Sequence, residues 1–366
     1  MNTIDDKRVV LTLDAGGTNF VFSAIQGNEE IVIPIAKPSN AHDLDLCLET
    51  IVSGFEEVIS KLNVTPVAIS FAFPGPADYP NGIIGDLGNL PAFRGGIALG
   101  PMLEEKFGLP VFINNDGDLF AYGEAIAGLL PSINEKLEKA GSPKRFKNLV
   151  GITLGTGFGA GIVRDGELLI GDNSGAGEVW LLRNKLHPEM NMEESISIRA
   201  IQRVYSRVSG DSSELTPKDI FDIATGDKSG DAKAAKEAFS TIGESLGDAI
   251  GHLVTLIDGI VVIGGGLSGA YSLIFPAMFE EMNGTFTNFN GDSYRRLVQQ
   301  PFDFENEDEL KQFLKGNSKE ITVPGSDKKV QYDSLSRTGV GISKLGASKA
   351  ISIGAYAFAL NALDKR

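Results

Sequence analysis

Short apolar runs alternate with glycine-rich turns along the first third of the chain. Residues 9–13 and 20–25 are β-rich runs on either side of a turn at 14–19, and this order predicts a β-hairpin. Apolar residues recur at helical spacing over 44–62, which predicts an amphipathic helix. Further strands are expected at 67–73 and 111–113, and further helices at 99–107 and 120–130.

The hairpin pattern recurs later in the chain. An apolar run at 149–154 leads into a glycine-rich turn at 155–161 and then into more apolar residues. Such an internal repeat predicts two related lobes, each of which opens with a hairpin. We expect an N-terminal lobe over 1–119 and a C-terminal lobe over 120–366. Later elements are expected at 241–256 (helix), 259–263 (strand), from about 268 (helix) and 347–363 (a closing helix that packs back on the N-terminal lobe).

Residues 286–335 depart from this pattern. Five of the seven residues 303–309 are acidic, and they precede a short helical pattern at 310–314. A Pro-Gly-Ser-Asp turn at 324–327 lies between two β-rich runs, which predicts a second kind of hairpin. We interpret the segment as a solvated insertion, with a contact between protein copies as the alternative.

Composition sets limits on partners. The 366 residues exceed what one hydrophobic core usually serves, so two domains are expected. Lys and Arg number 33 against 48 Asp and Glu, which gives a net charge of −15. Because such a chain repels phosphate backbones and anionic lipid, we expect no nucleic-acid or membrane partner. An anionic ligand must then be held by backbone amides, helix ends or a metal.

Cysteine and histidine are scarce. The single cysteine, Cys47, excludes an internal disulfide and a multi-cysteine zinc site. The three histidines are far apart in the sequence, which argues against a metalloprotease-type cluster. Neither a signal peptide nor an uncharged apolar stretch of membrane-spanning length is visible, so a cytoplasmic protein is expected.

Three glycine-rich strand ends are candidate nucleotide sites. Glycines let the backbone approach a phosphate, and successive turn amides form an anion-binding nest. Asp14, at the end of the first strand, is placed to orient a hydrated Mg²⁺. One such turn is more often only a hairpin, but three across two lobes predict a nucleotide held in a cleft. No Gly-Lys-Ser/Thr follows, so this is not a P-loop. The candidate residues are Gly16, Gly17, Thr18, Gly155, Thr156, Gly157, Gly264, Gly265 and Gly266.

An Asn-Asp pair is the candidate catalytic group. Asn115 and Asp116 follow the apolar strand at 111–113, and ligand clefts of α/β proteins open at the carboxyl ends of strands. Phosphoryl transfer needs a base that accepts the proton of the attacking hydroxyl. Asp116 is the candidate base, and Asn115 is a candidate ligand of sugar hydroxyls. Taken alone, such a pair is more often a turn.

The ordered set of motifs resembles the ROK family of sugar kinases. The segments 14–18, 115–116, 154–161, 175–178 and 264–266 occur in the order found in that family, and 344–347 and 353–355 resemble its final helix. The resemblance covers nearly the whole chain apart from 286–335. It implies an α/β, actin/hexokinase-like (ribonuclease H-like) duplicated two-lobe fold, with ATP and sugar in the cleft between the lobes.

The resemblance also implies residue roles. Asp116 matches the catalytic base and Asn115 a sugar ligand of the family. ATP and Mg²⁺ are the implied cofactors, the 6-hydroxyl of an aldohexose is the implied acceptor, and a homodimer is expected. Further sugar contacts are implied at Gly75, Asn89, Glu178 and Glu193.

One departure from the family concerns its zinc loop. Typical members follow Ala-Gly-Glu with a histidine and then a cysteine-rich zinc loop, whereas Asn184, Leu186 and Asn191 fall where the cysteines would be. Because neither Leu nor a neutral Asn replaces a thiolate, we expect no zinc. Trp180 and Leu182 are expected to supply apolar packing in its place.

Other functions are open at this point. Some members of the family are sugar-sensing repressors with a DNA-binding domain before the first turn, but that turn begins here at residue 14. A catalytically silent sugar sensor is the main alternative, although it would be free to lose the phosphate turns and Asp116. Among kinases, glucose is the first expectation, with N-acetylmannosamine or another N-acetylhexosamine, fructose, mannose and allose as alternatives.

Overall fold

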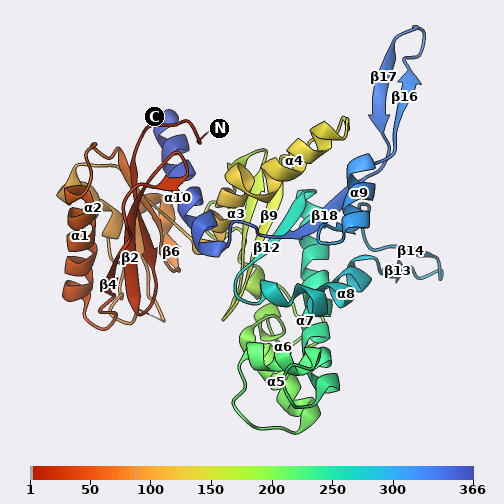
Figure 1. Ribbon diagram of the computed structural model, residues 1–366, viewed down its shortest axis with the longest axis horizontal. Helices are drawn as coiled ribbons and strands as arrows, with labels where there is room; N and C mark the ends of the chain where they lie inside the picture. Colours follow the sequence, from red (N-terminus) through yellow and green to blue (C-terminus); the bar gives the residue numbers. More distant parts are fainter. Residues whose placement is uncertain (1–2, 89) are drawn as a thin grey trace. The chain divides into compact units, whose positions relative to one another are not determined.

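A computed structural model describes residues 3–88 and 90–366 of the chain. The chain divides into two compact units (Figure 1). The first unit comprises Met1–Gly128, Gly161–Gly177 and Leu345–Arg366, and the second comprises Leu129–Ala160 and Glu178–Lys344. The closing helix of the chain thus belongs to the first unit.

The first unit is built on a sheet with the strand order β3-β2-β1-β5-β8, and β4 also pairs with β2. β1 and β2 form the antiparallel hairpin that the sequence predicts, and β1, β5 and β8 run parallel. The carboxyl ends of β1, β5 and β8 therefore meet at one edge. The strands are β1 (Val10–Ala15), β2 (Asn19–Gln26), β3 (Glu29–Glu30), β4 (Ile35–Pro38), β5 (Ala68–Ala72) and β8 (Val111–Asn114); a small separate pair is β6 (Ala77–Asp78) and β7 (Ile83–Ile84), with the 3-10 helix η1 (Tyr79–Asn81) between them.

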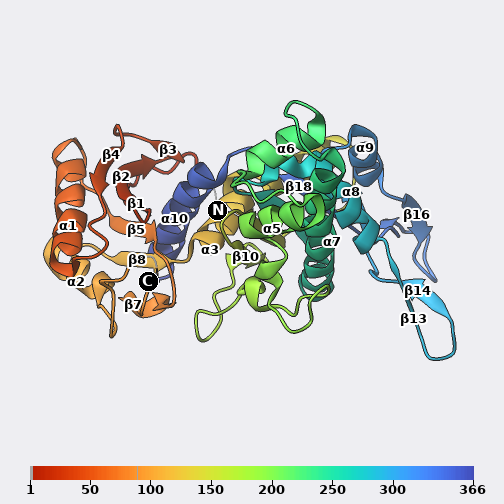
Figure 2. The ribbon, with the colours of Figure 1, turned by 90° about the horizontal axis from the view of Figure 1, so that it is seen from below.

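Helices cover both faces of this sheet (Figure 2). Because strand side chains alternate between faces, Leu11 and Leu13 pack with α1, while Val10 packs with α10. α1 contributes Ile51 and Phe55 to the larger core. The helices are α1 (Leu44–Ser60), α2 (Leu99–Phe107), α3 (Asp116–Ala127) and α10 (Ala347–Asp364).

α3 and α10 cross so closely that their backbones are in contact. A Cβ atom added at Gly123 of α3 would lie 1.9 Å from the carbonyl oxygen of Ala350, and one added at Gly354 of α10 would lie 1.9 Å from that of Leu119. Only glycine allows this approach. The bounds expected for a helix over 120–130 were wrong. α3 begins at Asp116 and ends at Ala127, and a separate helix, α4 (Leu129–Lys139), follows.

The second sheet has the strand order β11-β10-β9-β12-β18-β15, and the division between the units falls within β10. β9, β12, β18 and β15 run parallel. Apart from β15 at the edge, the order of strands along the chain repeats that of the first sheet, which confirms the predicted internal repeat. The strands are β9 (Leu149–Leu154), β10 (Phe158–Arg164), β11 (Glu167–Leu168), β12 (Ile260–Gly264), β15 (Gln300–Asp303) and β18 (Arg337–Ile342).

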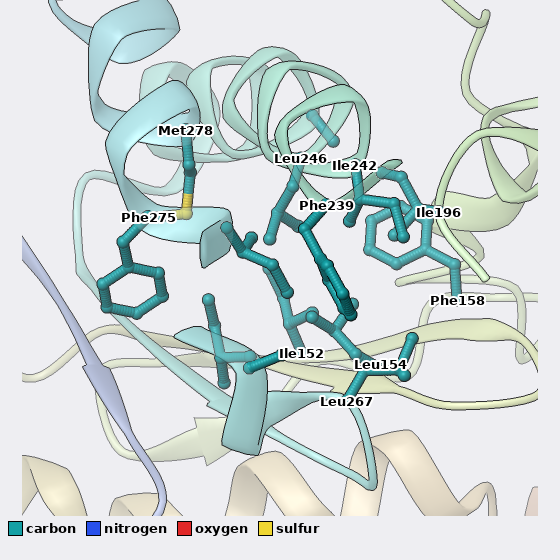
Figure 3. Close-up of a cluster of buried hydrophobic side chains, with 14 of the residues drawn as sticks. Ile152, Leu154, Phe158, Ile196, Phe239, Ile242, Leu246, Leu267, Phe275 and Met278 are labelled. Atoms are coloured by element: carbon teal, nitrogen blue, oxygen red, sulfur yellow. The ribbon is translucent and has the colours of Figure 1, made fainter. Parts of the chain in front are cut away.

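The core of the second unit is centred on α7 (Ala232–Ile257). Figure 3 shows Phe239 and Leu246 of α7 in one buried cluster with Leu154 of β9 and Phe275 of α8. Full burial of each such side chain contributes about 1.5–3 kcal/mol. α7 begins nine residues before the expected start at 241, because Asp231 accepts hydrogen bonds from the amides of the first turn. The other helices are α5 (Ile198–Ser209), α6 (Pro217–Thr225), α8 (Tyr271–Met282), α9 (Glu307–Lys315) and the 3-10 helices η2 (Val179–Leu181), η3 (Met192–Glu194) and η4 (Ser268–Ala270).

The segment 286–335 is not a single solvated insertion. β15 within it joins the second sheet, and Phe302 and Phe313 are buried. The exposed parts are two hairpins, β13 (Thr285–Thr287) with β14 (Ser293–Arg295) and β16 (Ser318–Thr322) with β17 (Lys329–Asp333). The second is the hairpin that the sequence predicts. Over residues 3–88 and 90–366, no helix is both long and apolar enough to cross a bilayer.

Candidate active site

The first glycine-rich turn is fixed from its carbonyl side. Ser39 Oγ donates a hydrogen bond to the Gly17 carbonyl oxygen (2.6 Å), and the Ser39 amide donates to that of Thr18 (2.9 Å). The C=O and N–H of a trans peptide point in opposite directions, so the Thr18 amide faces away from Ser39. A Cβ atom at Gly16 would lie 2.9 Å from the Asn19 carbonyl oxygen. The turn is therefore held in shape without using the Thr18 amide.

Asn115 and Asp116 sit where β8 passes into α3. Asn115 caps the helix, and its Oδ1 accepts from the Gly117 amide at 2.8 Å. Asp116 Oδ1 accepts from the same amide at 2.8 Å. The other half of each side chain, Asn115 Nδ2 and Asp116 Oδ2, takes no part in this cap. The fold thus presents one amide donor and one carboxylate acceptor side by side.

Asp14 and Asp116 are electrostatically coupled across this edge of the first sheet. The pKa of Asp14 is raised above its ordinary value, first because surrounding protein partly desolvates the carboxyl and second because the Asp116 carboxylate repels its charge. A divalent cation would relieve that repulsion, and carboxylates are ligands that Mg²⁺ prefers. The pair therefore fits the expected magnesium site.

Gly75 follows β5 at the same sheet edge. The Phe73 amide donates to the Asn114 carbonyl oxygen at 3.0 Å, and Tyr79 Oη donates to the Phe73 carbonyl oxygen at 3.0 Å. These bonds fix the turn that contains Gly75 beside the end of β8. Asn89, another expected sugar ligand, lies outside the residues that the structure describes.

Gly161 is a site residue whose role the sequence did not reveal. A Cβ atom there would lie 2.4 Å from the Gly117 carbonyl oxygen and 2.6 Å from Asp118 Cα. β10 thus approaches the first turn of α3, directly behind Asp116. The available signal was the pair of glycines at 159 and 161 within β10, because glycine inside a strand often marks a place that another backbone approaches closely.

The second glycine-rich turn, in the second unit, is held by a carboxylate. Glu193 Oε2 accepts from the Phe158 amide at 3.1 Å, and Arg199 donates to Glu193 Oε1 at 3.1 Å. The turn also closes on itself, since the Gly155 amide donates to the Gly157 carbonyl oxygen at 3.1 Å. Glu193, expected to bind sugar, therefore already supports the Gly155–Thr156–Gly157 turn.

The third glycine-rich strand end lies against β9. Gly265 has φ = +87°, and a Cβ atom there would lie 2.3 Å from the Leu154 carbonyl oxygen. A cavity of about 190 Å³ opens beside it, lined by Gly266, Phe221 and Lys218 among others. An aromatic side chain and exposed glycine backbone both offer flat surfaces, which suit a nucleobase.

Glu178 begins the segment that replaces the zinc loop. It is exposed and accepts a hydrogen bond from the indole N–H of Trp180. The expectation that Trp180 packs internally was wrong, because its side chain is 36% exposed. Leu182 does pack against the core, as expected, and Met192 is fully buried there.

Asn184 organises this segment through its carboxamide. Nδ2 donates to the Asn191 carbonyl oxygen (3.0 Å) and to Ser195 Oγ (2.7 Å), and Oδ1 accepts from the amides of Leu186 and His187 (both 3.0 Å). The side chain is fully buried. One neutral side chain therefore ties together four points of the loop. Among residues 3–88 and 90–366, no group of three or more His, Cys, Asp or Glu is arranged to hold a metal ion.

The structure thus sorts the expected site residues into two groups. The edge of the first sheet brings together Asp14, Gly16, Gly17, Thr18, Gly75, Asn115 and Asp116. The second unit carries Gly155, Thr156, Gly157, Glu178, Glu193, Gly264, Gly265 and Gly266. The first group contains the neighbouring carboxyl groups of Asp14 and Asp116, and most of the second is glycine backbone.

Comparison with known proteins identifies the class. The ROK family profile matches residues 10–302, so the chain belongs to the ROK family. A glucokinase from Parabacteroides distasonis is 56% identical, with a TM-score of 0.92 over 99% of both chains. A ROK family glucokinase from Streptomyces griseus, solved with glucose and AMPPNP, is 17% identical, with a TM-score of 0.59 over 95% of this chain and 98% of that one. These neighbours confirm the predicted α/β, actin/hexokinase-like fold class.

A curated relative names a different sugar. The N-acetyl-D-glucosamine kinase of Vibrio cholerae is 29% identical over 283 residues, which are 72% of this chain and 86% of that protein. The relatives named here are therefore all sugar kinases, but they differ in the sugar that their names give.

Proposed function

We propose that the chain is an ATP-dependent hexose kinase that phosphorylates the 6-hydroxyl of an aldohexose. The observation that carries this proposal is that Asn115 and Asp116 are both anchored through Oδ1 to the Gly117 amide at the start of α3, which leaves Asn115 Nδ2 and Asp116 Oδ2 out of the cap, and that Asp116 lies near Asp14. A carboxylate that is anchored through one oxygen keeps the other oriented toward a substrate hydroxyl.

The acceptor step follows from these groups. Asn115 Nδ2 donates to one sugar hydroxyl, and Asp116 Oδ2 accepts the proton of the 6-hydroxyl as its oxygen attacks the γ-phosphorus of ATP. The bond between that phosphorus and the β–γ bridging oxygen breaks, and ADP leaves. Gly75, Asn89 and Glu178 are proposed as further contacts to the sugar. Glu193, which the sequence also suggested as a sugar contact, is proposed instead to hold the second glycine-rich turn in shape.

The nucleotide step uses backbone donors. The turn amides at Gly16, Gly17 and Thr18 and at Gly155, Thr156 and Gly157 are proposed to hold phosphate oxygens. Asp14 is proposed to hold Mg²⁺ through water, and that ion would neutralise charge on the phosphates. The adenine is proposed to occupy the 190 Å³ cavity between Phe221 and Gly266.

Glucose is the proposed sugar. The support is the 56% identity with a protein named a glucokinase, which exceeds the 29% identity with the N-acetyl-D-glucosamine kinase. N-acetylglucosamine is the second candidate, because that curated relative carries its name. A homodimer remains a proposal from the resemblance, and light scattering would measure it.

A coupled ATP assay tests the proposal. We expect glucose 6-phosphate from glucose at the highest kcat/KM among glucose, N-acetylglucosamine, N-acetylmannosamine, fructose, mannose and allose. Preference for N-acetylglucosamine would support the proposed kinase activity but replace glucose as the proposed substrate. Tight binding of a sugar without any phosphorylated product would instead show a sensor and overturn the proposal.

A further inference from the structure

A cavity of about 480 Å³ lies within the first unit, between the sheet and the start of α10. Thr12 of β1 and Ser23 of β2 face it from the sheet, where they are register partners, and Ser352 faces it from the helix. Asn28, in the turn between β2 and β3, also lines it. Asp14 lies at its border, but none of its other lining residues has a role in the proposed transfer.

Two residues that line this cavity each carry a buried polar atom without a partner among the described residues. Ser23 is 4% exposed and Asn28 is 8% exposed. Among the residues that the structure describes, neither Ser23 Oγ nor Asn28 Oδ1 has a hydrogen-bond partner. Leaving a buried polar atom unsatisfied is costly, so such atoms normally bind water or a ligand. Asn28 also has φ = +68°, an uncommon conformation for a residue other than glycine.

The lining selects the chemistry of the occupant. Asp14, Glu29 and Glu30 supply carboxylates, and the one lysine, Lys349, is already paired with Glu29 at 3.1 Å. Phosphorylated and carboxylated ligands are therefore disfavoured, whereas hydroxyl donors match the acceptors. The apolar side chains of Val21, Ile25 and Ile353 complete the wall, and they suit the C–H face of a sugar ring.

We propose that this cavity is a second binding site, which takes a small neutral polyol such as an unphosphorylated pyranose. Its hydroxyls donate to Asn28 Oδ1 and exchange hydrogen bonds with Ser23 Oγ. The site is separate from the proposed sugar contacts at Asn115 and Asp116, and it does not depend on the kinase activity.

The cavity is mechanically close to the catalytic residues. The first turns of α10 line the cavity. The same helix then packs closely against α3 at Gly123 and Gly354, and α3 carries Asp116. Its border includes Asp14, whose charge is coupled to that of Asp116. An occupant therefore contacts the elements that position both carboxylates without touching the reacting atoms.

Equilibrium dialysis with radiolabelled D-glucose up to 50 mM tests the site through a matched pair of variants. Ser70 on β5 is also fully buried with an unpartnered Oγ among the described residues, but it does not line the cavity. Ser23→Ala should raise the dissociation constant of the glucose that binds in the cavity at least fivefold. Ser70→Ala should leave that dissociation constant unchanged. Equal weakening by both variants would overturn the proposal.

A filling variant gives an independent measurement. Ser352→Leu, on the half-buried side of α10, should reduce the glucose bound per chain by one relative to the wild type. Equal amounts in both proteins would mean that the cavity holds only water. Displacement of this glucose by putrescine would show that the cavity takes a cation and would overturn the assignment to a neutral polyol. Because the readout is a difference between variants, it stands even if glucose is not the kinase substrate.

Discussion

The two glycine-rich turns look alike in sequence but are held in opposite ways. Ser39 binds the first turn through the carbonyl oxygens of Gly17 and Thr18, while Glu193 binds the second through the Phe158 amide. The carboxylates beside them also differ. Asp14 and Asp116 repel one another, whereas Glu193 is paired with Arg199.

This contrast separates a sheet edge with two mutually repelling carboxyl groups from a turn with one neutralised carboxylate. Two carboxyl groups that are not paired with a basic side chain among residues 3–88 and 90–366, such as Asp14 and Asp116, are suited to bind a cation and to accept a proton. They lie next to a turn whose Thr18 amide points away from Ser39. A carboxylate that is neutralised by arginine and bonded to an amide is suited to hold backbone in place. Four substitutions test the contrast.

Asp116→Asn should abolish most turnover. The amide cannot accept the proton of the attacking hydroxyl, and loss of a general base costs about 10²–10⁴-fold in kcat. The KM values for ATP and sugar and the thermal midpoint should stay near those of the wild type, because Asn can still accept the hydrogen bond from the Gly117 amide. Steady-state kinetics and calorimetry measure both. Near-normal turnover would show that Asp116 is not the general base.

Gly161→Ala should destabilise the protein by about 1–3 kcal/mol, the usual cost of overpacking a tight site. The added methyl group would meet the Gly117 carbonyl at 2.4 Å and push on the first turn of α3. Gly155→Ala is the matched control, since a Cβ atom there has nothing within 4 Å. Denaturant unfolding compares the two. Equal stability of both variants would contradict the close approach behind Asp116.

Glu193→Gln should raise the KM for ATP about fivefold, since weakening one charge-assisted hydrogen bond costs roughly 1 kcal/mol. Gln keeps an acceptor for the Phe158 amide but loses the ion pair with Arg199. Glu194→Gln, which affects the neighbouring carboxylate that binds Arg203, should change this KM by less than about twofold. If the KM for sugar rises instead of that for ATP, Glu193 acts on the sugar and the contrast between the turns fails.

Asp14→Asn should slightly raise the thermal midpoint at pH 7 while lowering turnover. A carboxyl whose folded pKa is raised stabilises the fold only at low pH, and this contribution is lost as pH rises above its ordinary value of 3.8. The gain of the variant should therefore shrink as pH falls toward 3.8. Asp6→Asn should behave oppositely at pH 7, because the hydrogen bond from Arg8 lowers the pKa of Asp6. Melting curves from pH 4 to 8 compare the two.

The elements that the sequence predicted best are local ones. The hairpins at Asp14 and Gly155 and the strand that leads to Asp116 depend on runs of apolar residues followed by glycine or a capping residue. Those signals lie within a few positions of one another. For this reason the sheet edge and most of its candidate residues could be located before the fold was known.

What the sequence did not reveal depends on partners far along the chain. Nothing near Gly123 indicates that Ala350 will approach it, and Glu193 shows no local sign that it will bind the Phe158 amide. Asn184 was interpreted only as a lost metal ligand, since its four hydrogen bonds form after the loop has folded around it. Helix starts were also misplaced where a cap, such as Asn115 or Asp231, precedes the apolar pattern.

The crossing of α3 and α10 has a consequence for synthesis of the protein. Gly123 and Gly354 meet although 230 residues separate them in the sequence, and the first unit contains both the beginning of the chain and Leu345–Arg366. On a ribosome, the helix that carries Asp116 must wait for the last segment to emerge before its neighbour is in place. A chain that stops before α10 therefore lacks the packing partner of the helix that carries Asp116.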